Sequence, residues 1–186
     1  MRFIKYLLVF AVHGVVFTFL GVLTLILLQQ KDRPDLKSWH LADLKAEFQA
    51  ADVARIETLE DYLRLEDRLF GELQKAVYGE VAPADRRALN RFNGGSLSDP
   101  ERQPVNWNRS FVLEAEQPRG GVLLLHGMSD SPYSLRAIGQ LLHEQGFSVV
   151  GLRLPGHGTA PTGMVQLDWR DMAAATRIAA KSLQTL

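Results

Sequence analysis

The chain has no cysteine among its 186 residues. Disulfides, a thiolate nucleophile and a cysteine-type zinc site are therefore excluded. An excess of charge is also missing, because 21 Lys and Arg balance 21 Asp and Glu. A neutral chain has no overall electrostatic preference for nucleic acid, so we expect no nucleic-acid partner. We also expect neither a metal nor another cofactor, because the histidines lack the paired spacing of metal ligands. They stand at positions 13, 40, 126, 143 and 157.

Charged residues are absent from Leu7 to Leu28. About twenty apolar residues at a rise of 1.5 Å match a hydrocarbon core of about 30 Å. A cleaved signal peptide is the alternative, but its apolar region is shorter and ends in a small-residue cleavage site. The residues from Leu27 to Lys31 offer no such site. We therefore expect a single-pass anchor that contacts the lipid bilayer through Leu7 to Leu28.

Positive charges flank this apolar run on both sides. Arg2 and Lys5 precede it, whereas Lys31, Arg33 and Lys37 follow it. The positive-inside rule gives nearly equal weight to the two orientations. We expect a cytoplasmic N-terminus, with the body of the protein outside the cytoplasm of a bacterial inner membrane.

From Asp35 to about Val81 the apolar residues recur at helical spacing. Thr58 followed by Asp61 is a weak capping box for a helix of this region. The charged residues between the apolar positions, Glu66 among them, are interpreted as a solvated face. The alternative is a stalk or cap that lies over a neighbouring domain or binds a partner, since the apolar stripes must bury against something.

Asn90 to Asn108 is rich in Asn, Gly, Ser, Asp and Pro and is expected to be a loop. Within it, Gly94 to Ser98 approaches the esterase pattern G-x-S-x-G but ends in serine. It also lacks the strand before and the helix after that a nucleophile elbow requires. We do not expect a nucleophile in this loop.

The stretch from Gly120 to Pro161 has the pattern of a strand, a loop, a helix and a second strand. Short apolar runs bounded by breakers, Val122–Leu125 and Phe147–Leu152, predict the strands. Between them leucines and an isoleucine recur at helical spacing up to Gly146, a residue suited to end a helix. Such a unit predicts a parallel pair of strands.

Two further elements flank this unit. Ser110–Ala115 is expected to be a strand that forms an antiparallel hairpin with Val122–Leu125. A helix capped by Asp168 is expected to run from Trp169 towards Leu183.

The motifs LLLHGMSDSP and RLPGHGT, in this order and with these elements between them, resemble the α/β-hydrolase superfamily. The likeness is to its monoacylglycerol lipase, carboxylesterase and serine-aminopeptidase-like branch, and it covers about Ser110 to Leu186. It implies an α/β fold in which this part forms the first half of a hydrolase sheet, after the N-terminal transmembrane helix and the helical linker expected from the residues. That half comprises the β-hairpin, the βαβ unit and a following helix. The expected domains are an anchor at 1–33, a helical stalk or cap with a loop at 34–108, and an incomplete hydrolase domain at 109–186.

The resemblance also implies roles for particular residues. The backbone N–H of Met128 would belong to the oxyanion hole, where donors face the developing negative charge. Gly127 would let the backbone turn sharply, and His126 and His157 would shape their loops. Apart from the resemblance, we expect Tyr133 and the Met128 thioether to line the acyl pocket.

The Ser129-Asp130-Ser131 run beside His126 does not suggest a catalytic triad, because all four residues lie on one turn. In the family order the nucleophile, the acid and the base follow the helix that begins near Asp168. The sequence given stops at Leu186, so we expect an N-terminal fragment that is inactive alone. Val122–Leu125 would then be an exposed apolar edge.

The expected function is therefore serine-type hydrolysis of acylglycerols, lysophospholipids or other small esters. Three alternatives stay open: a half-length protein completed by another chain, a non-catalytic interaction module at the membrane, and a non-hydrolytic relative with another nucleophile.

Overall fold

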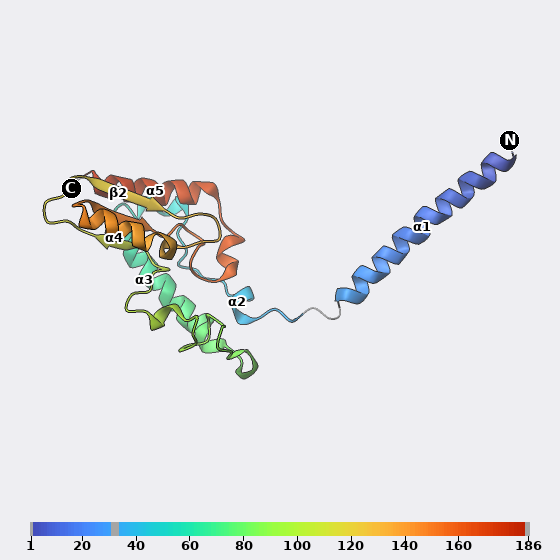
Figure 1. The fold of residues 1–186 in the computed structure, drawn as a ribbon, viewed down its shortest axis with the longest axis horizontal. Helices are drawn as coiled ribbons and strands as arrows, with labels where there is room; N and C mark the ends of the chain where they lie inside the picture. The colour runs from blue at the N-terminus through green and yellow to red at the C-terminus, as the bar shows by residue number, and fades with distance from the viewer. Residues whose placement is uncertain (1, 31–33, 185–186) are drawn as a thin grey trace. The chain divides into compact units, whose positions relative to one another are not determined.

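The computed structural model describes residues 2–30 and 34–184, and it divides into two units, 1–36 and 37–186. The first unit contains the helix α1, Arg2–Gln30 (Figure 1). The side chains of residues 2–29 are exposed, and by length and composition the helix is able to cross a membrane. A signal sequence near an N-terminus meets the same criterion.

The second unit begins with helices. A single turn, α2 (Ser38–Leu41), is followed by the long helix α3 (Leu59–Ala76). The predicted capping box at the start of α3 is confirmed: the Asp61 N–H donates to Thr58 Oγ1 and the Thr58 N–H donates to the Asp61 carboxylate, both at 3.1 Å.

The continuous helical pattern expected from Asp35 to Val81 is only partly right. Between α2 and α3 only the short 3-10 helix Ala50–Ala54 forms. Backbone donors in this stretch bond to distant side chains: the Ala46 N–H donates to Glu72 (3.0 Å) and the Ala50 N–H to Asp171 (2.6 Å). These hydrogen bonds hold the segment against α3 and the C-terminal helix, and the Phe48 side chain of this segment is buried.

Three strands form one sheet in the order β1-β3-β2, with β1 at Phe111–Leu113, β2 at Gly121–Leu125 and β3 at Ser148–Leu152. The expected parallel pair is confirmed, because β2 and β3 run parallel with Val122 opposite Val149. The expected hairpin is wrong: β1 pairs antiparallel with β3, not with β2.

The reason lies in the centre of β3. Phe111 pairs with Gly151, and its ring lies over the space that a side chain would fill. A Cβ at Gly151 would stand 2.1 Å from the Phe111 ring. The chain of β3 is buried along its whole length, so it takes the central position with a neighbour on each side.

Two helices complete the unit. The helix α4 (Arg136–Glu144) contacts β1 and β3, and α5 (Trp169–Leu183) contacts β2 and β3. Both follow the prediction, with Asp168 capping α5 and Gly146 taking a φ of 85° after α4. The main core lies between β3, α3 and α5, and it includes Phe48, Tyr62, Val150, Leu152, Ala175 and Ile178.

The strand β2 is the edge of the sheet within the described residues, because its one neighbour is β3. Its five residues are apolar or glycine, yet none is fully buried, and Leu125 is 44% exposed. An apolar edge of this kind presents unpaired backbone groups to a further strand. The arrangement agrees with the expected open edge at Val122–Leu125.

Candidate functional site

His126 follows β2 directly and joins two loops. Its ring is buried, and Nε2 accepts the N–H of Leu154 at 3.1 Å. Its Nδ1 lies 3.0 Å from the carbonyl oxygen of Gly127. Because a carbonyl only accepts, Nδ1 carries the proton and the ring is neutral. Burial lowers the pKa of His126, in keeping with this state. Both nitrogens are engaged with backbone, so the ring is not free to act as a base.

The loop after His126 is a tight turn from Gly127 to Asp130, closed by the Asp130 N–H on the Gly127 carbonyl (3.3 Å). Ser129 has a φ of 61°, which is typical of the third residue of a type II turn. The left-handed residue is thus Ser129 rather than Gly127, where a Cβ would meet nothing within 4 Å.

Met128 occupies the second position of this turn. Among the residues that the structure describes, no group accepts a hydrogen bond from its backbone N–H. Its side chain is 69% exposed. An unpaired N–H in the turn that follows a strand is the type of donor that an oxyanion hole requires.

The second loop, Leu154–Thr159, is buried and depends on its glycines. Gly156 and Gly158 have φ values of 78° and 74°. A Cβ at Gly158 would lie 2.6 Å from the Asn108 carbonyl oxygen, so no other residue fits there. His157 Nδ1 donates to the Pro155 carbonyl (2.8 Å), and its ring packs edge-on against His126 with centroids 5.0 Å apart.

The two loops border a cleft of about 620 Å³. It is lined by Ser129–Ser131 from the first loop, by Gly156–Pro161 from the second, and by Arg91, Phe92, Asn108 and Met164. Tyr133 lies elsewhere: it lines a separate cavity of about 360 Å³ with Trp107, and the Arg136 guanidinium lies 3.7 Å from its ring centre.

Buried polar atoms without partners gather at this cleft. Within the described residues, Arg91 Nε, His157 Nε2 and Thr159 Oγ1 are buried and make no hydrogen bond, and all three belong to residues that line it. Native proteins pair the great majority of such atoms, so a cluster of exceptions calls for an explanation, such as an ordered water or a bound polar group.

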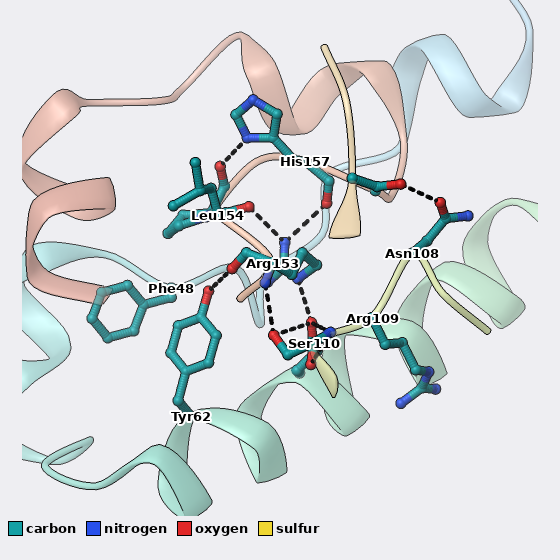
Figure 2. Close-up of polar contacts among 12 residues, drawn as sticks. Phe48, Tyr62, Asn108, Arg109, Ser110, Arg153, Leu154 and His157 are labelled. Carbon is teal, nitrogen blue, oxygen red and sulfur yellow. Dashed lines mark hydrogen bonds and ion pairs between the residues drawn. The ribbon is translucent and has the colours of Figure 1, made fainter. Parts of the chain in front are cut away.

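The sequence interpretation missed Arg153, which is 1% exposed at the centre of a buried polar cluster (Figure 2). Its guanidinium forms ion pairs with Glu66 (2.8 Å) and Glu47 (3.0 Å). Glu66 itself is 3% exposed, so its assignment to a solvated face is wrong. A charged residue inside the apolar run Val149–Leu154 was the signal that was available in the sequence.

Ion pairs and hydrogen bonds keep the Arg153 guanidinium of this cluster charged. Burial alone would lower the pKa of Arg153, but attraction to the Glu47 and Glu66 carboxylates more than offsets it, and the pKa is raised. Burial also raises the pKa of the Tyr62 hydroxyl, which donates to the Arg153 carbonyl at 2.7 Å. Ser110 links the remaining groups: its N–H donates to Glu66 (3.0 Å) and its Oγ accepts the Arg153 N–H (2.8 Å).

The described residues of this region do not form a triad. Ser131 Oγ donates to the Asn108 side chain (2.8 Å), not to a histidine, and His126 bonds only backbone. The rejection of a triad among these residues therefore agrees with the geometry of the described loops.

No family model matches the chain. A curated protein, the thermostable monoacylglycerol lipase of Bacillus sp. (strain H-257), is 36% identical over 61 residues, which are 33% of this chain and 24% of the lipase. A solved structure from a study of two metagenome-derived lipolytic enzymes, LipS and LipT, is 29% identical at a TM-score of 0.40. That match covers 45% of this chain and 33% of the solved one.

The match to the curated lipase spans about a quarter of that protein's length. Over this part, the match supports an α/β-hydrolase-like relationship, in agreement with the resemblance of the motifs. Its small mixed sheet and flanking helices are consistent with a partial α/β-hydrolase fold.

Proposed function

We propose that the chain builds the oxyanion-binding side of a membrane-anchored serine-type hydrolase of esters or lipids. The observation that carries the proposal is the unpaired Met128 N–H, in a turn joined by His126 to the glycine-rich loop. One such donor contributes about 3 kcal/mol of transition-state stabilisation to acyl transfer. Gly127 and His126 shape the turn, and Met128 supplies the donor.

The nucleophile, the acid and the base come from outside the described residues. In α/β-hydrolases the nucleophile stands on a sharp turn between a strand and a helix. The open side of β2 is the place for that strand, because its backbone groups are unpaired there and its apolar side chains are half exposed. This chain is then the N-terminal part of the enzyme and is inactive alone.

The substrate is an acylglycerol, a lysophospholipid or another small ester. The relative named a monoacylglycerol lipase supports a lipid ester, and α1 supports action at a bilayer. We place residues 1–33 as the anchor, 34–108 as a helical segment with a loop, and 109–186 as the hydrolase part, outside the cytoplasm. Tyr133 would contact substrate from the 360 Å³ cavity that it lines.

A fluorophosphonate probe, which labels only an activated serine, tests this proposal. Two forms are compared: the 186-residue chain and a form extended by the coding sequence that follows Leu186. We expect the extended form to be labelled and the shorter chain to stay unlabelled. Labelling of the shorter chain would contradict the missing nucleophile. An extended form that folds and resists the probe would favour a non-catalytic or non-hydrolytic relative.

A further inference from the structure

We infer that Arg153 is a positioning residue through which the helical segment 37–76 fixes the turn that carries Met128. The acid clamp is defined here as Glu47 and Glu66 together with the Arg153 guanidinium that they pair with. The two acids belong to the helical segment, and Arg153 follows the end of β3. This inference rests on the proposed function only for the effect of Arg153 on catalysis. The contacts themselves stand without it.

The first step is the burial of the clamp. Arg153 is 1% exposed and Glu66 is 3% exposed, so neither charged group is in contact with bulk solvent. Breaking a buried pair by removing one partner leaves an uncompensated buried charge, which strongly destabilises the fold. The guanidinium is therefore held in one place by residues that precede the sheet by some forty positions or more in the chain.

The second step leads from the guanidinium to the glycine-rich loop. Arg153 Nη1 donates to the carbonyl of His157 (3.0 Å) and lies 3.4 Å from that of Leu154, while the same atom reaches Glu47 (3.2 Å). Figure 2 shows the Leu154 and His157 carbonyls converging on one side of Arg153. The same guanidinium also pairs with the Glu47 and Glu66 carboxylates. A planar guanidinium with five N–H donors can bind the loop carbonyls and the two carboxylates at once. A lysine ammonium has three donors and cannot reproduce this forked arrangement.

The third step leads from that loop to the proposed oxyanion turn. The His157 ring packs on His126, whose Nε2 accepts the N–H of Leu154, the residue after Arg153. His126 in turn holds the carbonyl of Gly127. The chain of contacts thus ends at the peptide bond between Gly127 and Met128, whose N–H is the unpaired donor. The helical segment therefore packs against the residues that support the site, and it is not a stalk separated from them.

Nuclear magnetic resonance of the full chain in detergent micelles tests the inference without any catalysis. Selective ¹⁵N labelling of histidine and methionine reports on few groups, since the chain has five histidines and four methionines. Signals are assigned with His126→Gln, His157→Gln and Met128→Leu. The test variant is Arg153→Lys, which keeps the charge and removes the fork.

The matched control is Arg109→Lys. Arg109 also pairs with a carboxylate of α3, Asp67, but it is partly exposed, and its side chain points away from the cluster in Figure 2. We expect Arg153→Lys to shift the ring signals of His126 and His157 and the Met128 amide signal. Arg109→Lys should leave all three unchanged. Unshifted signals in a folded Arg153→Lys variant would overturn the inference and leave Arg153 as a structural cross-link only.

If Arg153→Lys does not fold, Glu47→Gln decides the matter, because it weakens one arm of the clamp and leaves the Glu66 pair in place. The same three signals should then move, by less; if they stay fixed, the inference is wrong. In a form that the fluorophosphonate labels, Arg153→Lys should also slow labelling, on the order of tenfold to a hundredfold. Absence of labelling in every form would count against the proposed function, while the resonance shifts would still test the clamp.

Discussion

At the scale of single residues, the site depends on side chains that bind backbone. His126 uses both ring nitrogens on peptide groups, Tyr62 donates to a carbonyl, and Arg153 holds two more. Backbone orientation is what an oxyanion donor needs, because the N–H must already point at the place where charge develops. We therefore propose that His126, Tyr62 and Arg153 support the backbone of the site and do not react themselves.

A pH dependence of stability follows from the neutral state of His126. Its folded pKa lies below 6.5, because burial disfavours the charged ring. Well above pH 6.5 neither the folded nor the unfolded state binds the proton, and the full stability is present. As the pH falls from there towards the lower folded pKa, the unfolded state takes up the proton first. Stability is then lost at up to about 1.4 kcal/mol per pH unit.

Urea unfolding at a series of pH values between about 5 and 7.5 measures this loss. His126→Gln should flatten the dependence over that interval. A wild-type chain with no slope in this interval would contradict the buried neutral ring.

At the scale of elements, most helices and strands followed from local patterns. The Thr58 and Asp168 caps, the apolar run of β3 and the glycine after α4 act within a few residues, so the sequence displays them. The partner of β1 was not predictable in this way. It depends on Phe111 fitting over Gly151, forty residues later, and a local pattern does not carry such a contact.

The candidate site was likewise predictable only where it depends on local sequence patterns. The turn at Met128 and the glycine-rich loop were found from motifs. The acid clamp was missed because Glu66 occupies a polar position of an otherwise amphipathic helix, and only the fold shows that this position faces Arg153. Helical periodicity tells which side of a helix is polar, but it does not reveal that a polar side is buried against another charge.

The sheet supplies a matched pair of glycine substitutions. Gly151→Ala places a Cβ 2.1 Å from the Phe111 ring and should destabilise the fold by about 1–3 kcal/mol or more. Gly71→Ala lies within α3 with open space around it and should stabilise by about 1 kcal/mol. Thermal unfolding compares the two. A Gly151→Ala variant as stable as the parent chain would contradict the pairing of β1 with β3.

At the scale of the whole molecule, an apolar helix and an α/β body occur in one chain. We expect α1 to remain attached and to hold the chain in membranes. Intact mass should show the N-terminal residues, and alkaline carbonate should not extract the protein. A product shortened near residue 30 would instead identify a signal sequence.

A pair of double substitutions gives this prediction its control. Leu20→Arg with Leu23→Arg places two charges in the middle of the apolar run, at a cost of about 2.5–3.5 kcal/mol each in a membrane. Leu89→Arg with Leu97→Arg alters two exposed residues of the second unit. Only the first pair should release the protein into the soluble fraction.

The most direct measurement concerns the Met128 N–H itself. Proline suits the second position of a type II turn, so Met128→Pro preserves the turn and deletes the donor. In an enzyme form that fluorophosphonate labels, Met128→Pro should lower kcat for a short-chain ester by about 10² to 10³. Met128→Leu, which keeps the N–H, should stay within a few-fold of the parent, and both variants should unfold at similar temperatures. A folded Met128→Pro enzyme with undiminished kcat would contradict the account.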